Sequence, residues 1–235
     1  VGSNRKIDPS RRAHLKPDNT PNDNDRIEIG PTALAFAEWE NLGLSAPDMP
    51  ALREYRLSRL QDQIRQHDCA GLLLFDPLNI RYATDTTNMQ LWIAHNMARA
   101  CFVPPEGKVI LWDFHNCEHL SAHLPLVGEV RHGASFFYFE TGDQTEQAAA
   151  AFAEQVLDVM RQHAGTNKRL AVDKIENIGY VSLRSCGVEV LEGQVLTEHA
   201  RSIKNENELN AMRCAIAACE AAVEEMRTIM RPGIS

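Results

Sequence analysis

The sequence has no long apolar run and no surplus of positive charge. No segment approaches the roughly 18 to 20 consecutive apolar residues that span a bilayer, and the opening residues, VGSNRKIDPS, lack the apolar centre of a signal peptide. Lys and Arg number 24 against 32 Asp and Glu, which gives a net charge of −8 at pH 7. Because phosphate binding needs a basic face, we expect no nucleic-acid partner. Because an apolar run and a signal peptide are missing, we expect a cytoplasmic protein that binds no membrane.

Several chemical motifs are absent as well. The six cysteines form no C-x-x-C pair and nothing indicates a secreted protein, so we expect reduced thiols that are mostly small core residues. No G-x-G-x-x-G or G-K-[ST] occurs, which excludes the nucleotide-binding loops that these motifs form. No G-x-S-x-G occurs either, so a hydrolase with that nucleophile elbow has no support.

The sequence does contain an alternation of strand and helix patterns. Hydrophobic residues make up 44% of the 235 and charged residues 24%, enough for one large core or for a domain plus part of another. Apolar runs typical of strands occur at 71–75, 99–103, 108–114, 169–173 and 188–193. Helical patterns occur at 33–43, 49–67, 116–124, 144–163 and near 175–185. Turn residues between the second and third apolar runs predict a hairpin. The alternation predicts an α/β fold with a mixed sheet flanked by helices.

The two ends of the chain differ from this pattern. Residues 1–30 are rich in Pro, Asp, Asn and charge, which is typical of an arm that lies over a surface. At the other end, Asn205 and Glu208 predict the capping box of a long helix. The apolar residues of this helix form a continuous seam, made of Leu209, Met212, Ile216, Cys219, Val223, Met226 and Met230. Such a seam needs a partner surface, which we expect in chain that follows Ser235.

Three histidines, His115, His119 and His123, recur every four residues in DFHNCEHLSAH. On a helix this spacing places them along one face, where they could bind a metal. The first and third would lie about 12 Å apart along the helix axis, which is too far for one ion. The spacing therefore favours a solvated polar helix face, with adventitious nickel or zinc binding as the alternative.

Three further features leave alternatives open. The aromatic run at 136–139 could stack a ligand, but its pattern favours a buried strand. Asp113 and Asp173 each follow an apolar run, where α/β sheets often place active groups, and they could equally be turn or cap residues. The segment DPLNIRYATDTTNMQLW (76–92) has the pattern of a strand-to-turn connection, in which the first residues shape the turn.

Four stretches of the chain resemble the creatinase/prolidase/aminopeptidase P superfamily, metalloenzymes with a pita-bread catalytic domain behind a creatinase-like N-terminal domain. The stretches are REYRLSRLQDQI, GLLLFDPLNIRYATD, RLAVD and RSIKNENELNAMRCAIAACEAAVEEMRTIMRPGIS. We expect an N-terminal arm and short helix over 1–48, and the resemblance implies a creatinase-like domain over 49–203. It also implies that 204–235 is the first helix of a truncated pita-bread domain.

The chain departs from the peptidases of that superfamily in two places. Where many of them have Tyr-Leu-Thr-Gly, it has YATD (82–85) followed by TTNMQLW, and its polar arm contains RKIDPSR and TPNDNDRIEIGP. Both features resemble the dimethylsulfoniopropionate lyases of the DddP type. That resemblance implies the N-terminal part of a dimeric, metal-dependent lyase that cleaves dimethylsulfoniopropionate to dimethyl sulfide and acrylate. The alternatives are an Xaa-Pro peptidase or creatinase-like hydrolase, and a non-catalytic creatinase-like interaction module.

The same resemblance implies where the chemistry lies. It implies a homodimer in which the N-terminal domain of one subunit reaches over the active site of the other. It also implies a site for divalent metal ions (iron, zinc or manganese) in the rest of the catalytic domain, so we expect neither a catalytic residue nor a metal ligand in these 235 residues. Because aromatic faces suit a sulfonium cation, we predict that Trp92 binds the small-molecule substrate, with His95 and Asp85 as companions.

Overall fold

The computed structural model describes residues 31, 33–88, 90–114, 117–121 and 123–233. The predicted arm over 1–30 lies outside the described residues, as do the side chains of residues 90–92 and 119. Within the described chain, six strands form one sheet in the order β4-β3-β2-β1-β5-β6. They are β1 (Gly71–Leu74), β2 (Ala100–Val103), β3 (Val109–Trp112), β4 (Val127–Arg131), β5 (Arg169–Val172) and β6 (Glu189–Glu192). The sheet is mixed, as predicted, because β2 is antiparallel to both of its neighbours while the other pairs are parallel.

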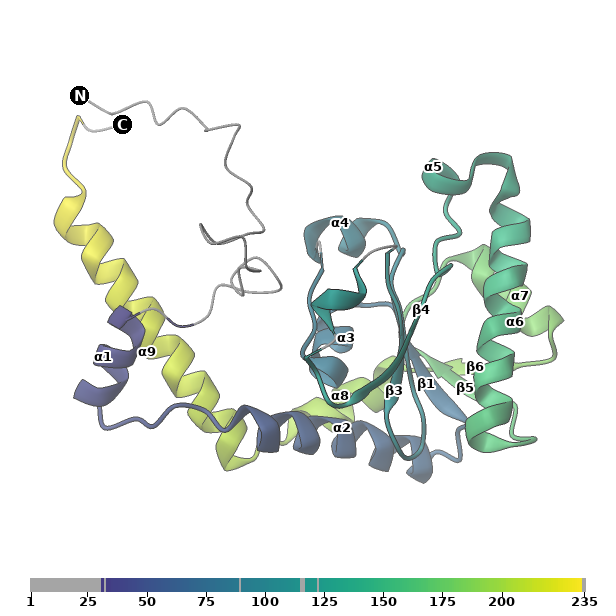
Figure 1. The fold of residues 1–235 in the computed structure, drawn as a ribbon, viewed down its shortest axis with the longest axis horizontal. Coiled ribbons are helices and arrows are strands. Elements are labelled where there is room, and N and C mark those ends of the chain that lie inside the picture. The colour runs from purple at the N-terminus through teal and green to yellow at the C-terminus, as the bar shows by residue number, and fades with distance from the viewer. Residues whose placement is uncertain (1–30, 32, 89, 115–116, 122, 234–235) are drawn as a thin grey trace. The chain divides into compact units, whose positions relative to one another are not determined.

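Helices separate most of the strands along the chain (Figure 1). They are α1 (Ala33–Asn41), α2 (Met49–Gln66), α3 (Pro77–Thr84), α4 (Gln90–His95), η2 (Glu118–Leu120), α5 (Tyr138–Thr141), η3 (Gly142–Gln144), α6 (Thr145–Ala164), α7 (Asn177–Ser185), α8 (Gln194–Ser202) and α9 (Glu206–Ile229). The helices predicted over 33–43, 49–67, 144–163 and near 175–185 are confirmed as α1, α2, α6 and α7. In the part of the chain that the structure describes, no helix has the length and apolar character to cross a membrane.

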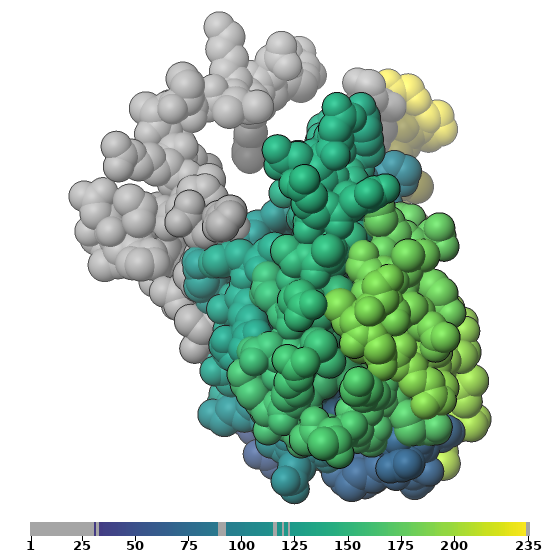
Figure 2. All heavy atoms as spheres, turned by 90° about the vertical axis from the view of Figure 1, so that its right-hand side faces the viewer, coloured from purple at the N-terminus to yellow at the C-terminus, as the bar shows by residue number. Residues whose placement is uncertain are grey.

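Alternate residues of β1 enter two separate hydrophobic cores, one on each face of the sheet. Leu73 belongs to the core beneath α6 and α7, whereas Leu72 and Leu74 belong to the core beneath α2 and α8. This period-two alternation is typical of a strand that is buried on both faces. Figure 2 views the molecule from the side of α6 and α7, which form the outer layer there. The predicted α/β fold with helices on both faces is confirmed.

The cysteines are free thiols, as predicted. Cys69, Cys101 and Cys214 are buried, and burial raises the pKa of the Cys101 thiol to about 12. Because the thiolate is the reactive form of cysteine, Cys101 serves as a small core residue and not as a nucleophile.

Residues 77–84 form helix α3 and not the predicted turn. Asp76 is its N-cap, since Oδ1 accepts the backbone N–H groups of Leu78 (2.9 Å) and Asn79 (3.2 Å). Pro77 follows in the first turn, where its missing N–H removes no intrahelical hydrogen bond. The prediction was wrong because an Asp-Pro pair can start a helix as well as a turn.

The aromatic run at 136–139 is not a buried strand. Phe136 is buried in the core beneath α6, but Tyr138 and Phe139 are 71% and 85% exposed and lie in the one-turn helix α5. Successive residues of a helix point about 100° apart, so one turn directs neighbouring rings away from a common core. The buried-strand prediction is therefore wrong for Tyr138 and Phe139.

The helix predicted over 116–124 is also wrong for the described part of that range. Hydrogen bonds there join residues three apart and form the short 3₁₀ helix η2, with Leu120 bonded to Cys117 and Ser121 bonded to Glu118. His115 and the side chain of His119 lie outside the described residues, and His123 is exposed. Among the residues with a described placement, no group of three or more His, Cys, Asp or Glu could hold a metal ion.

The N-cap predicted for the long helix α9 is confirmed, but its capping box is only half formed. Oδ1 of Asn205 accepts the backbone N–H of Glu208 (2.9 Å). The Glu208 carboxylate does not complete the box, because it pairs with Nε of Arg56 on α2 (2.9 Å). This ion pair fixes the start of α9 against α2.

Helix α9 packs on α1 and leaves its apolar seam exposed. Cys214 and Ala217 are buried with Ala35 and Trp39 of α1, and Nε1 of Trp39 donates to the Cys214 carbonyl (2.7 Å). The seam residues Met212, Ile216, Cys219, Val223, Met226 and Met230 are exposed. The seam therefore has no apolar cover within the described residues.

Candidate functional site

Four charged residues meet at one edge of the sheet. Asp113 and Asp173 directly follow β3 and β5, and Asp76 lies just after β1, so the carboxyl ends of these parallel strands place all three there. Arg99 directly precedes β2, and it reaches the same edge because β2 is antiparallel to β1 and β3. Ligands of α/β sheets often bind at the carboxyl ends of the strands, which makes this edge the candidate site.

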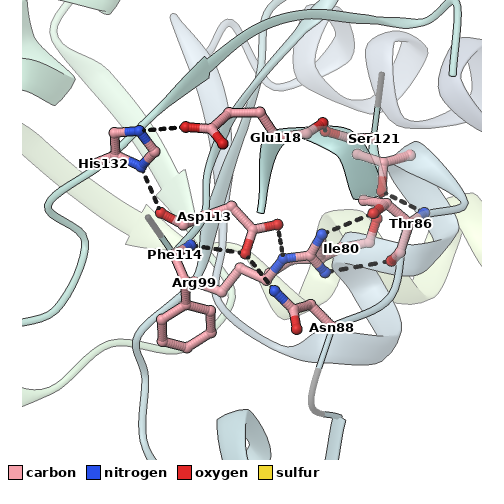
Figure 3. Close-up of polar contacts among 10 residues, drawn as sticks. Ile80, Thr86, Asn88, Arg99, Asp113, Phe114, Glu118, Ser121 and His132 are labelled. Atoms are coloured by element: carbon pink, nitrogen blue, oxygen red, sulfur yellow. Dashed lines mark hydrogen bonds and ion pairs between the residues drawn. The ribbon is translucent and has the colours of Figure 1, made fainter. Parts of the chain in front are cut away.

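Arg99 and Asp113 form an ion pair with no exposed side-chain surface (Figure 3). Nε of Arg99 lies 2.9 Å from Oδ2 of Asp113, whose Oδ1 accepts Nδ2 of Asn88 (2.8 Å) and the backbone N–H of Phe114 (2.9 Å). Removing two charges from water costs several kcal/mol per ion, so such a pair is tolerated only when further hydrogen bonds satisfy both groups. Both groups of this pair are satisfied.

The guanidinium of Arg99 also holds the segment that follows α3. Its Nη2 donates to Oγ1 of Thr86 (2.9 Å), and its Nη1 lies 3.4 Å from the Thr86 carbonyl oxygen. The backbone N–H of Thr86 donates to Oγ1 of Thr84 (3.1 Å), which in turn donates to the Ile80 carbonyl (2.7 Å). Hydrogen bonds therefore connect the strand edge continuously to the end of α3.

His132 extends this cluster on the β4 side. Its Nδ1 bonds the carbonyl oxygen of Asp113 (3.0 Å), and its Nε2 lies 2.9 Å from Oε1 of Glu118 (Figure 3). The imidazole thus links the residue after β3 to the η2 turn. The carboxylate of Asp113 itself has three donors, so its role at this edge is that of an anchor.

Asp173 is a second buried carboxylate at the edge. It accepts the backbone N–H groups of Phe75 (2.8 Å) and Asp76 (3.2 Å) and Nδ2 of Asn79 (2.9 Å). The amide oxygen of Asn79 accepts Nη1 of Arg201 from α8 (2.9 Å). Burial raises the pKa of Asp173 to about 6, although the hydrogen bonds from Asn79 and Phe75 act in the opposite direction. Asp173 therefore fastens the turn between β1 and α3 to the end of β5.

The raised pKa of Asp173 predicts a pH-dependent contribution to stability. A carboxyl whose pKa is higher in the folded than in the unfolded state favours folding when protonated, so this contribution is complete below about pH 4 and lost as the pH rises through about 6. Asp173→Asn removes the titration. Urea unfolding at pH 4 and pH 7 measures the free energy of unfolding of the parent and of the variant. The stability of the parent relative to the variant should be roughly 2–3 kcal/mol lower at pH 7 than at pH 4. An equal difference at both pH values would contradict the assignment.

The three residues predicted to bind substrate lie in or just before α4. Trp92 and His95 both belong to α4; His95 is exposed, whereas the side chain of Trp92 is outside the described part of the chain. Asp85 is the C-cap of α3, with a left-handed φ of 62°. Its Oδ2 accepts Nε (2.8 Å) and Nη2 (2.7 Å) of Arg53, so this carboxylate already has a cationic partner that ties α3 to α2.

The roles of Arg99, Thr86 and Asn88 are not among the sequence predictions. A signal for the ion pair is present, because an Arg before one strand of a hairpin and an Asp after the other face each other at its open end. The register confirms this geometry, with Ala100 opposite Trp112. Thr86 and Asn88 carry no comparable signal, since their contacts depend on where α3 ends.

This chain belongs to the family described as the creatinase/prolidase N-terminal domain, whose model matches residues 56–229. Two curated relatives are similar along nearly the whole chain, and both are named dimethylsulfoniopropionate lyase DddP. The protein from Roseovarius nubinhibens is 52% identical over 230 residues, and the one from Roseobacter denitrificans is 51% identical over 227. The matches cover 98% and 97% of this chain but 51% of each relative. The chain thus spans about half the length of these relatives.

Two solved structures with a similar fold are dipeptidases. The Xaa-Pro dipeptidase from Bacillus anthracis matches with a TM-score of 0.52 and 19% identity, over 77% of this chain and 44% of that enzyme. A dipeptidase from Pyrococcus horikoshii OT3 matches with a TM-score of 0.50 and 17% identity, over 74% of this chain and 44% of that enzyme. At such identities the similarity shows a shared fold alone. The family match over residues 56–229 confirms the predicted place of this chain in the creatinase/prolidase superfamily.

Proposed function

We propose that this chain is the creatinase-like part of a lyase that cleaves dimethylsulfoniopropionate to dimethyl sulfide and acrylate. The observation that supports this most strongly is the 52% identity over 230 residues to a dimethylsulfoniopropionate lyase. That match is longer than the family match over 56–229 and leaves out only a few residues of the chain. It therefore includes most of the polar arm, one of the two features that differ from the peptidases.

An Xaa-Pro peptidase is the second candidate, because the solved structures with this fold include an Xaa-Pro dipeptidase. Its support is weaker, since 19% identity reflects a common fold and a fold by itself does not determine the reaction. A non-catalytic interaction module has no counterpart among the relatives described above.

In the proposed lyase, a base removes the proton next to the substrate carboxylate, and the bond from carbon to sulfur breaks as dimethyl sulfide leaves. The contribution that we propose for this chain is binding of the cation. A sulfonium is a soft cation, and an aromatic face attracts it by about 0.5–2 kcal/mol. Trp92 is the proposed aromatic partner and His95 a companion. Asp85 is assigned a positioning role, because Arg53 already occupies its carboxylate.

Divalent metal ions (iron, zinc or manganese) and a homodimer belong to the proposal for the whole lyase. The residues of the described chain do not fit a metal site: they contain no suitable group of three or more ligands, and Asp113 and Asp173 are each bound by N–H donors. We therefore assign no metal ligand here. The exposed apolar seam of α9 suits burial against a further part of the catalytic domain or a second subunit.

The proposed reaction is tested with the full-length protein that contains this chain. After loading with iron, zinc or manganese, the protein should convert dimethylsulfoniopropionate into equal amounts of dimethyl sulfide, measured by gas chromatography, and acrylate, measured by liquid chromatography. It should release no proline from Xaa-Pro dipeptides. Protein-free substrate and chelator-treated protein are the controls. Release of proline without release of dimethyl sulfide would contradict the lyase proposal and support the peptidase.

A further inference from the structure

Hydrogen bonds attach helix α4 to the sheet edge both before its first residue and near its last. Before the helix, Nδ2 of Asn88 donates to Asp113, and Oγ1 of Thr86 accepts Nη2 of Arg99 (Figure 3). Near its end, the Ala94 carbonyl accepts Nζ of Lys174 at 3.1 Å. Lys174 directly follows Asp173, so this second attachment starts from the end of β5.

Buried apolar residues hold the same helix in addition to the two polar attachments. Ile93 is 1% exposed. Met97, just after the helix, is buried in the core beneath α6 and α7. A helix of six residues is far too short to be stable by itself in water, so tertiary contacts determine where α4 lies.

The geometry requires an arginine at the centre of this arrangement. One planar guanidinium bonds Asp113 on one side and both oxygens of Thr86 on another, which a single ammonium group cannot do. The pair is fully buried, so water does not compete for these contacts. The segment from Thr86 to Asn88 is thus fixed to the end of β3.

We propose that Thr86, Asn88, Arg99, Asp113 and Lys174 form a clamp, the α4 clamp, that positions α4 and so places Trp92 at the substrate. This inference rests on the proposed function. The five are positioning residues, which act through the helix that carries Trp92 and His95. Their loss should weaken substrate binding more than it slows the chemical step, because a displaced binding residue raises KM with little change in kcat.

Two variants test the clamp without removing a buried charge. Asn88→Ala deletes the contact to Asp113 before α4, and Lys174→Met deletes the contact to Ala94 while keeping the length of the side chain. In the full-length enzyme, each should raise KM for dimethylsulfoniopropionate on the order of three- to tenfold and change kcat less than about twofold. Trp92→Ala, measured in parallel, shows how much KM increases when the binding residue itself is removed, and this increase is the reference for the two clamp variants.

Hydrogen exchange gives a readout that does not depend on activity. Backbone amides at 93–97 should exchange on the order of fivefold faster in both variants, with other segments unchanged. Lys174→Arg keeps a donor for the Ala94 carbonyl and should restore both KM and exchange. Lys108→Met is the matched control, because Lys108 is an exposed lysine at the opposite end of β3; it should match the parent.

The outcomes separate the clamp from the proposed function. Unchanged KM and unchanged exchange in both variants would overturn the clamp. A parallel fall of kcat and melting temperature, with KM unchanged, would overturn it too, since that indicates a merely structural role. If the parent releases no dimethyl sulfide, the proposed function fails, and exchange at 93–97 alone then decides whether the clamp holds α4.

Discussion

Replacing Arg99 by methionine should lower the free energy of unfolding by about 3–5 kcal/mol. The substitution leaves the fully buried carboxylate of Asp113 without its counter-charge, and an uncompensated buried charge destabilises a fold by that amount. Both oxygens of Thr86 lose their contacts to the guanidinium at the same time. Urea unfolding of the intact protein, followed by far-UV circular dichroism, measures the change.

Asp62→Asn is the matched control for this prediction. It breaks the ion pair between Asp62 and Arg65, whose side chains are 45% and 50% exposed, and pairs of that kind contribute about 0–1 kcal/mol. The double variant Arg99→Met/Asp113→Leu removes both buried charges. The double variant should lose about 2 kcal/mol less stability than the sum of the losses of Arg99→Met and Asp113→Leu measured separately. A loss for Arg99→Met no larger than that for Asp62→Asn would show that the buried pair does not stabilise this edge.

Phe152→Ala should cost about 3–5 kcal/mol of stability. Phe152 of α6 is fully buried, and its ring contacts the rings of three aromatic residues. The ring centroids lie 5.7 Å from Phe75, 5.4 Å from Trp112 and 5.3 Å from Phe136. Truncation therefore removes three aromatic contacts and opens a cavity between α6 and the sheet. The same urea unfolding experiment measures the loss.

Phe139→Ala is the control, because it makes the same substitution at a ring that is 85% exposed. Its effect should stay within about 0.5 kcal/mol. Phe152→Leu refills most of the space, so it should recover more than half of the stability that Phe152→Ala loses. Equal losses at the two phenylalanines would mean that Phe152 is not at the centre of the core.

Much of the fold could be predicted because its signals are local. Each apolar run at 71–75, 99–103, 108–114, 169–173 and 188–193 became a strand, and the turn residues at 104–107 correctly predicted the antiparallel pairing of β2 with β3. The prediction failed at 77–84 and 136–139, where the composition suits both a turn and a helix, or both a core and a surface. Helix α8 was not predicted.

The candidate site was predictable only in part. Asp113 and Asp173 were selected because they follow strands, and both are buried at the sheet edge. Trp92 and His95 were selected by resemblance and stay predictions for the proposed lyase. Asp85 was selected in the same way, and the structure adds that its carboxylate is paired with Arg53.

The sequence by itself determined the class of fold and the family, because periodicity and short motifs are properties of neighbouring residues. The tertiary structure decided which polar groups meet. Asp173 bonds Asn79 across 94 positions, and Lys174 bonds Ala94 across 80. Contacts over such separations depend on how strands order in a sheet, and no local pattern encodes that order. The attachment of α4 to the sheet edge, and with it the proposed clamp, therefore emerges only when the chain is folded.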